Sequence, residues 1–187
     1  MSEYFDLRRE DGSLTGERKA RELVHRDGDL HGTAHVWLAR PDGESFDLLL
    51  QKRSDWKDAF PGCWDISSAG HLPAGSDFRE SALRELREEL GLEAEPEDLE
   101  FAGIRRRNLD TEFYGRPFLD NEYAAVYLCR KPVDPNALRL QAEEVSAVRF
   151  LEFQTLLSAL DDPDFPNCIF EDELRMIERA YRRGKEA

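Results

Sequence analysis

The chain has 187 residues, of which 40% are hydrophobic and 35% charged, so it has the composition of an ordinary globular protein and enough length to bury a core. Its net charge of −14 argues against a nucleic-acid partner, which would require a basic surface, and no apolar run approaches the roughly 20 residues that cross a bilayer. We therefore expect one domain over residues 1–187 that binds neither nucleic acid nor a membrane, and we leave a homodimer open.

Apolar patterning and turn residues predict the elements in the first half of the chain. Residues 4–7 favour a short strand, and the polar run at residues 18–25 favours a helix. The apolar stretches at residues 34–39 and 46–51 flank a Pro-Asp-Gly turn, which predicts a hairpin of two strands. A short extended segment at residues 64–68 follows a Pro-Gly break.

The second half mixes helical and extended patterns without strict alternation. Helical periodicity runs through residues 78–90, and two more helices are expected at residues 153–160 and 171–183. Three more strands are predicted from their apolar residues, at residues 99–104, 122–129 and 145–151. We therefore predict an α+β fold in which helices pack over a mixed sheet.

The cysteines and the first residues bear on location. Cys63, Cys129 and Cys168 are odd in number and widely spaced, which favours neither a disulfide framework nor a zinc pair. The first six residues lack the basic start and apolar stretch of a secretory signal. Both observations favour reduced thiols in a cytoplasmic protein.

Three glutamates gather on one side of the predicted helix at residues 78–90. Glu85, Glu88 and Glu89 project within roughly 100° of one another, while the leucines of the helix point to another side. A glycine directly after the helix supplies the left-handed residue that ends it. From these residues alone two interpretations stay open: a surface helix with ion pairs such as Arg84–Glu88, and a metal site built from carboxylates.

The loop before this helix favours the metal site. Residues 70–92 contain the spaced pattern Gly70, Arg84-Glu85-Leu86, Glu88-Glu89 and Gly91-Leu92, which resembles the Nudix box. One position departs from the family pattern, since Ser76 stands where a glutamate is usual, with Asp77 beside it as a candidate substitute. The resemblance implies a Nudix-type α/β/α sandwich with a central mixed β-sheet. It also implies a hydrolase that cleaves a diphosphate linkage in a nucleotide or related small molecule.

The resemblance assigns roles to the residues of the pattern. Glu85, Glu88 and Glu89 match catalytic glutamates that bind Mg²⁺ or Mn²⁺, Arg84 matches the arginine that orients them, and Gly70 belongs to the loop beside the substrate. Elementary chemistry agrees, because hard divalent cations bind carboxylate oxygens, polarise phosphorus and acidify water. A further carboxylate can then take the proton of the attacking water.

Other stretches resemble the isopentenyl-diphosphate isomerase-like branch of the family. They lie at residues 25–31, 34–37, 52–54, 61–65 and 120–122. By this resemblance His31, His71 and Glu122 match ligands of a divalent metal by position, with Glu122 also a catalytic acid. Asp120 stands where the second acidic ligand is a glutamate, and His25 is offset by one residue from a ligand histidine. Arg53 and Lys57 correspond to contacts with the diphosphate of the substrate. The sequence leaves the plainer alternatives open: packed histidines, a strand-start surface acid and a solvated basic pair.

Isomerase chemistry itself is not expected. The isomerase protonates carbon with a cysteine directly before its Gly-His pair, and Ala69 occupies that position here. Alanine cannot relay a proton, whereas all three glutamates of the box are kept, so hydrolysis is favoured. The alternatives are an isomerase-like protein and a module that binds a diphosphate without cleaving it.

The remaining polar and aromatic residues are expected to be structural. The three arginines at residues 105–107 are expected to form a solvated strand edge, with steering of an anion as the alternative. His25 is expected to be a hydrogen-bonded structural residue, and His35 to be packed or solvent-facing. Core packing is expected for most of a group of aromatic residues, Trp37, Trp56, Phe60 and Trp64.

Overall fold

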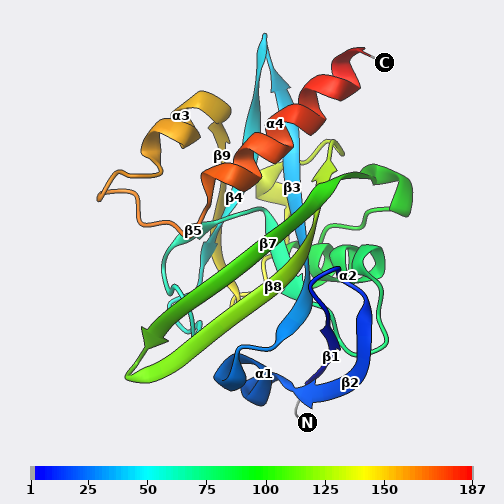
Figure 1. Cartoon of the computed structure of the whole chain (residues 1–187). Coiled ribbons are helices and arrows are strands. Elements are labelled where there is room, and N and C mark those ends of the chain that lie inside the picture. Colours follow the sequence, from blue (N-terminus) through cyan, green and yellow to red (C-terminus); the bar gives the residue numbers. More distant parts are fainter. Residues whose placement is uncertain (1–2, 187) are drawn as a thin grey trace.

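The structure, a computed structural model, describes residues 3–186 of the chain. In that part of the chain nine strands form one sheet, accompanied by four α-helices and two short 3₁₀ turns (Figure 1). The strands are β1 (Tyr4–Arg8), β2 (Leu14–Ala20), β3 (Leu30–Asp42), β4 (Ser45–Arg53), β5 (Trp64–Asp65), β6 (Ser68–His71), β7 (Leu99–Phe113), β8 (Arg116–Cys129) and β9 (Val145–Glu152). The helices are α1 (Arg21–Asp27), α2 (Phe78–Leu90), α3 (Phe153–Ala159) and α4 (Glu171–Glu186), and the turns are η1 (Pro96–Asp98) and η2 (Pro135–Ala137).

Strand β3 is the centre of the sheet. It pairs antiparallel with β1, β4 and β6 and parallel with β8, while β2, β5, β7 and β9 complete the flanks. In the β3–β8 ladder His31 stands opposite Glu122, and in the β3–β6 ladder Ala34 stands opposite Gly70. The predicted mixed sheet is confirmed, and its registers bring motifs that lie far apart in the chain onto neighbouring strands.

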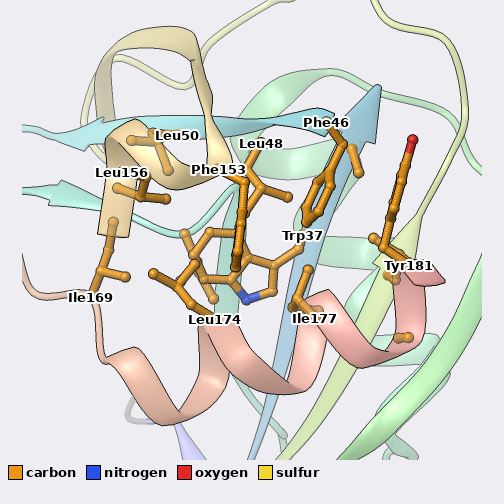
Figure 2. Packing of buried hydrophobic residues seen from close by; sticks show 14 of the residues in the cluster. Trp37, Phe46, Leu48, Leu50, Phe153, Leu156, Ile169, Leu174, Ile177 and Tyr181 are labelled. Atoms are coloured by element: carbon orange, nitrogen blue, oxygen red, sulfur yellow. The ribbon is translucent and has the colours of Figure 1, made fainter. Parts of the chain in front are cut away.

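Helices cover both faces of the sheet. Side chains alternate along β3, so that Val36 and Leu38 pack with α2 while Trp37 packs with α3 and α4. Figure 2 shows the second of these cores, where Trp37 lies beside Leu174 of α4 and Phe153 of α3. Each such fully buried apolar side chain contributes roughly 1.5–3 kcal/mol to stability. This arrangement is the α/β/α sandwich that the sequence predicts.

The helix predicted at residues 18–25 is partly wrong. Arg18 belongs to β2, because it pairs with Asp6 of β1 in the ladder, and α1 starts only at Arg21. Strand pairing overrides local helix preference at this point. The C-terminal helix predicted at residues 171–183 is present and continues to Glu186. Within residues 3–186, no helix has the length and apolar character needed to cross a membrane.

The hairpin of β7 and β8 is much longer than predicted. The sequence predicts strands at residues 99–104 and 122–129, whereas the two strands pair continuously out to a turn at Tyr114 and Gly115. Polar residues dominate this extension, so apolar alternation does not reveal it, and the backbone ladder itself sustains it. The consequence for the site is that Arg107 lies on a paired strand beside Glu122.

Candidate functional site

A cavity of about 790 Å³ lies where the elements of the resemblance meet. Side chains from α1, α2, β3, β6, β7 and β8 line it, together with the loops at residues 56–60 and 141–144 and the chain at the start of α4. A space of this size holds a small molecule such as a nucleotide. Two polar clusters lie at it, and we name them the glutamate end, Glu85, Glu88 and Glu89, and the histidine end, His25, His31, His71 and Asp120, in which His31 lies behind the lining residues.

Helix α2 presents the glutamate end because its termini and its apolar face are fixed. The Asp77 carboxylate caps it by accepting a hydrogen bond from the Glu80 N–H at 2.9 Å. Gly91, with a φ of 62°, ends it in the left-handed conformation, and Leu86 is fully buried beneath the sheet. Asp77 is therefore engaged as a cap, and neither it nor Ser76 is among the described residues that line the cavity. Asp77 does not take the place of the glutamate that Ser76 replaces.

The three glutamates of α2 differ in exposure. The Glu88 side chain is 51% exposed and the Glu85 side chain 13%, while Glu89 is buried. Glu89 Oε2 accepts hydrogen bonds from the Ser68 hydroxyl at 2.7 Å and from the Ala69 N–H at 3.2 Å. The structure brings all three predicted glutamates to the cavity, with Glu89 the most firmly held.

Arg84 and Gly70 fix the position of Glu85. Arg84 Nη2 donates to Glu85 Oε1 at 2.7 Å and to the His71 carbonyl at 3.1 Å, while Nη1 donates to Glu88 Oε2 at 3.3 Å. A Cβ atom on Gly70 would lie 2.0 Å from the carboxyl carbon of Glu85, so only glycine leaves room for that side chain. Arg84 orients the carboxylates by charge, and Gly70 admits one of them by its lack of a side chain.

Burial raises the pKa of the carboxyl groups around the cavity. It raises the pKa of Glu85 to about 8, with the charge of Glu89 adding to the effect. It raises the pKa of Glu89 to about 7 against the opposing hydrogen bond from Ser68, and burial together with Asp120 raises the pKa of Glu122 to about 7. The raised pKa values mean that the charged form of these carboxyl groups is unfavourable without a nearby cation. Several hard oxygen atoms at one place are also the ligands that Mg²⁺ or Mn²⁺ prefers, so the site fits such an ion.

Four side chains converge at the histidine end. One potential ligand atom from each of His25, His31, His71 and Asp120 lies within 4.8 Å of the others. The Nε2 atoms of His25 and His31 are 3.8 and 3.7 Å from Asp120 Oδ1. All three histidine Nε2 atoms and this oxygen are buried without a hydrogen-bond partner among the described residues. Such orphaned groups are uncommon, and three imidazoles with one carboxylate form a ligand set suited to a divalent transition metal.

The surroundings of these histidines keep them neutral and oriented. His31 Nδ1–H donates to the Asp29 carbonyl at 2.9 Å, which leaves the lone pair on Nε2 free. Phe5 stacks on His31 and His71, with ring centroids 5.3 and 4.8 Å apart. Burial lowers the pKa of His25 to about 3 and also lowers the pKa of His31 and of His71. Neutral imidazole is the form that binds a metal ion.

The membership of the histidine end differs from the predicted grouping. The resemblance matches His31, His71 and Glu122 by position and Asp120 and His25 less closely, whereas the structure groups the first two with His25 and Asp120 and leaves Glu122 outside the group. Glu122 Oε2 instead lies 4.0 Å from His35 Nε2 and 3.7 Å from Arg107 Nη1. Asp120 and Glu122 point to the same side of β8, so the pairing of that strand with β3 decides which carboxylate reaches the histidines.

His35 has a structural partner, as the sequence predicts for a packed residue. The Glu173 carboxylate at the start of α4 accepts hydrogen bonds from His35 Nδ1 at 3.1 Å and from Trp37 Nε1 at 2.8 Å. Burial alone would lower the pKa of His35, but the Glu173 charge raises it to about 9. This buried pair fixes α4 against the centre of the sheet.

Arg53 and Lys57 line the cavity, where contact with a diphosphate requires them. Both already have acidic partners. Arg53 Nη1 donates to Asp65 Oδ2 at 2.9 Å, and Lys57 is paired with Glu144. Their predicted role as phosphate contacts therefore depends on exchange of these partners.

One interpretation of supposedly structural residues is wrong. Arg105 is buried and donates to Asp172 at 2.8 Å, and Arg107 lines the cavity, so these arginines are not a solvated edge. The sequence reasoning missed them because the predicted strand stops at residue 104. Of the aromatic residues expected mostly in the core, Trp37 is fully buried and Trp64 packs against the core, whereas Trp56 is 86% exposed beside the cavity.

Comparison with known proteins places these features in a family. The NUDIX domain profile matches residues 29–171. Nudix hydrolase 3 of Arabidopsis thaliana is 42% identical over 164 residues, covering 87% of this chain and 21% of that protein, so the chain spans about a fifth of this relative's length. An uncharacterized Nudix hydrolase of Clostridium acetobutylicum is 35% identical over 160 residues, covering 86% of this chain and 75% of that protein.

More distant similarities bear on the branch and on the fold. An isopentenyl-diphosphate Delta-isomerase of Escherichia coli is 28% identical over 161 residues, covering 86% of this chain and 83% of the isomerase. The crystal structure of DR0079 from Deinococcus radiodurans superposes with a TM-score of 0.66 at 19% identity, covering 96% of this chain and 99% of that one. The two hydrolases named above are thus more similar in sequence than this isomerase, and DR0079 shares the fold.

Proposed function

The chain belongs to the NUDIX family of hydrolases, and on that premise we propose that it is a Mg²⁺- or Mn²⁺-dependent pyrophosphohydrolase. Its proposed substrate is a nucleotide or related small molecule with a diphosphate linkage. The observation that carries this proposal is the convergence of Glu85, Glu88 and Glu89 at the cavity, with Arg84 bound to two of them.

Each residue of the glutamate end has a role in this proposal. Its carboxylates would hold a divalent ion, which when bound would polarise the phosphoryl group and acidify a water molecule. Glu89, held by Ser68 and the Ala69 amide, is the best-fixed ligand, and Arg84 keeps Glu85 and Glu88 directed at the same place. Because one residue fixes a ligand and another orients two more, a single exposed acid would not be enough to hold the ion.

Residues outside the helix complete the proposed site. Arg53 and Lys57 contribute positive charge that attracts the diphosphate, and Gly70 keeps the loop backbone close to the substrate. Glu122 lines the cavity from β8 and is our candidate to accept the proton of the attacking water, or to bind metal.

We further propose that the histidine end holds a second divalent ion. His31 and His71 supply imidazole ligands, joined by His25 and Asp120, whose ligand atoms lie within reach of one another. The four orphaned ligand atoms support this proposal, because a metal ion would satisfy all of them at once. A cytoplasmic location and a homodimer stay predictions.

A substrate panel tests the proposed hydrolase. Purified protein is incubated with nucleoside diphosphates, nucleoside triphosphates, nucleotide sugars and isopentenyl diphosphate, each with Mg²⁺, Mn²⁺ or excess chelator. We expect phosphate-containing products from at least one nucleotide or sugar conjugate, and none in chelator. Product identity by mass spectrometry locates the bond that is cleaved.

The same panel separates the alternatives. Binding without products would favour a diphosphate-binding module. Conversion of isopentenyl to dimethylallyl diphosphate at ordinary enzymatic rates would favour an isomerase. We expect no such conversion, because Ala69 has no proton to give at the position where an isomerase needs a thiol.

A further inference from the structure

Arg107 has an incomplete set of partners. It lies on β7 directly opposite Glu122, and its side chain is only 14% exposed. Its Nη1 atom is 3.5 Å from Asp120 Oδ2 and 3.7 Å from Glu122 Oε2, distances of ion pairs rather than of good hydrogen bonds. Its Nε and Nη2 atoms are buried and have no hydrogen-bond partner among the described residues. Carboxylates therefore orient the guanidinium at Nη1, while the Nε and Nη2 donors on the other edge have no acceptor.

Two aromatic rings lie close to the same guanidinium. Its central carbon lies 5.0 Å from the ring centroid of Phe170 and 5.7 Å from that of Phe60. Phe60 has a φ of 50°, a conformation that a bulky residue adopts only when its surroundings impose it, and its ring contacts Phe113 of the hairpin. These cation–π contacts hold the guanidinium in place without accepting a hydrogen bond from Nε or Nη2.

The other cations of the cavity are engaged. In each of them a side-chain nitrogen lies no more than 3.0 Å from a carboxylate oxygen. The pairs are Arg21 with Glu3, Arg53 with Asp65, Lys57 with Glu144, Arg84 with Glu85, and Arg105 with Asp172. Among the described cavity residues, Arg107 thus combines a buried guanidinium with two orphaned donors on one edge. Leaving such donors unpaired is costly, which points to an external acceptor.

We propose that Arg107 is a substrate-binding residue whose Nε and Nη2 donors hold a phosphate group of the diphosphate substrate at the histidine end of the cavity. The inference rests on the proposed function and deepens it. Two parallel N–H donors on a planar fork match two oxygens of a phosphate group, a geometry that lysine cannot reproduce. The binding site then spans the cavity, with the glutamate end at one side and Arg107 at the other.

The charge around Arg107 selects the ligand further. Asp120 and Glu122 both lie within 4 Å of Nη1, so the neighbourhood is net acidic and repels an anion that arrives without cations. A diphosphate accompanied by divalent ions meets this condition, whereas a simple carboxylate does not. The appropriate probe is therefore inorganic pyrophosphate in the presence of Mg²⁺.

Calorimetric titration of pyrophosphate with Mg²⁺ tests the inference on the intact protein. The variants are Arg107→Met, Arg107→Lys and, as a matched control on the same strand, Arg106→Met. Arg106 is exposed, pairs with Glu10 and does not line the cavity. We expect Arg107→Met to weaken pyrophosphate binding roughly 10- to 100-fold, Arg107→Lys to fall in between, and Arg106→Met to stay within about twofold of wild type.

The lysine variant separates a binding role from a screening role. If Arg107 only neutralised Asp120 and Glu122, Arg107→Lys would bind pyrophosphate like wild type, and that result would overturn the inference. So would equal binding by Arg107→Met and Arg106→Met, or wild-type protein that does not bind the probe. Melting curves of each variant show whether it is folded, and the lysine variant keeps the test decisive if the methionine variant is not. Titration measures binding and needs no turnover, so it can fail or succeed independently of the hydrolase assay. If wild-type protein binds pyrophosphate but is inactive, and only the Arg107 variants lose binding, the proposed hydrolase function is refuted while this inference is sustained.

Discussion

The two ends of the cavity hold different kinds of ligand atoms in different ways. The glutamate end offers carboxylate oxygens from one helix, and its Glu88 side chain is half exposed. The histidine end offers neutral imidazoles and one carboxylate from α1, β3, β6 and β8, and His31 there is fully buried. Carboxylate oxygens suit a hard ion, which can reach solvent here beside Glu88, whereas buried imidazoles suit a transition metal that stays bound. The comparison therefore predicts one exchangeable ion that serves chemistry and one tightly held ion that organises the cavity.

The largest effect should follow from changing the best-fixed carboxylate of the glutamate end. Glu89→Gln keeps the shape and a hydrogen-bonding partner for Ser68 but replaces a charged ligand by a weak one. We expect turnover to fall by more than roughly 100-fold, beyond the loss typical of an outer-shell substitution. Steady-state assays with the substrate found in the panel measure this, with Glu93→Gln as the control because Glu93 is exposed beyond the end of the same helix. Retention of a tenth or more of the wild-type rate would remove the glutamate end from the chemistry.

A steric change should disturb the same end without altering any charge. In Gly70→Ala the new methyl group collides with the Glu85 carboxyl, which must leave its place. We expect activity to drop roughly 10- to 100-fold while the fold persists, since the displaced group is a proposed metal ligand at the cavity rather than a core residue. A double-mutant cycle with Glu85→Asp, whose shorter side chain relieves the collision, should show strong non-additivity. Simple addition of the two losses would mean that Gly70 acts on something other than Glu85.

The sequence predicted the two ends unequally for a physical reason. The glutamate end is encoded within residues 70–92, where helix periodicity alone places Glu85 and Glu89 together. The histidine end depends on strand pairing across the whole chain, and register decided that Asp120, not Glu122, faces the histidines. Local pattern carries no information about that register. The resemblance named His31, His71 and both carboxylates and placed His25 one residue away from a ligand position, but it did not decide which carboxylate joins the histidines.

The lack of long-range information in a local pattern also explains the wrong prediction for two arginines. Arg105 and Arg107 lie on the polar part of β7, where no alternation of apolar residues marks a strand, so a solvated edge was the natural expectation. The long ladder with β8 and the contact with α4 bury them instead. The core, by contrast, was predicted well because apolar periodicity in β3, β4 and α2 reports burial directly.

A change at the histidine end should affect metal content more than rate. His71→Asn removes one imidazole while leaving a polar side chain beside Phe5. We expect one tightly bound divalent ion per chain to be lost after dialysis, measured by elemental analysis, and turnover in excess Mg²⁺ to fall only about tenfold. Glu89→Gln is the reciprocal control, since it should retain that ion. If wild-type protein carries no tightly bound metal after purification with Mn²⁺ or Zn²⁺, the proposed difference between the two ends collapses.

The smallest expected effect is a pH dependence of stability in metal-free protein, to which the two ends contribute with opposite sign. At the histidine end burial lowers the pKa of His25 from 6.5 to about 3, so its contribution is present above pH 6.5 and is lost as the pH falls below that value. At the glutamate end burial raises the pKa of Glu89 to about 7 and of Glu85 to about 8, so their contribution is present below pH 4.5 and is lost as the pH rises through 7 to 8. His35, whose pKa of about 9 is raised from 6.5, adds to the loss at high pH.

Above pH 7 the histidine end no longer changes and the remaining contributions share one sign. The melting temperature of chelated protein should therefore fall by about 2–8 °C between pH 7 and pH 9 in scanning calorimetry. Mg²⁺ should raise the melting temperature more at pH 8.5 than at pH 6.5. At pH 6.5 the ion must displace protons from the glutamates, whereas at pH 8.5 these protons have already left. Glu85→Gln, which has no proton to lose, should flatten the decline, whereas His71→Asn should leave it in place. A melting temperature that rises from pH 7 to 9 in chelator would show that the buried glutamates already have a favourable partner, and the argument for a cation at α2 would lose its electrostatic basis.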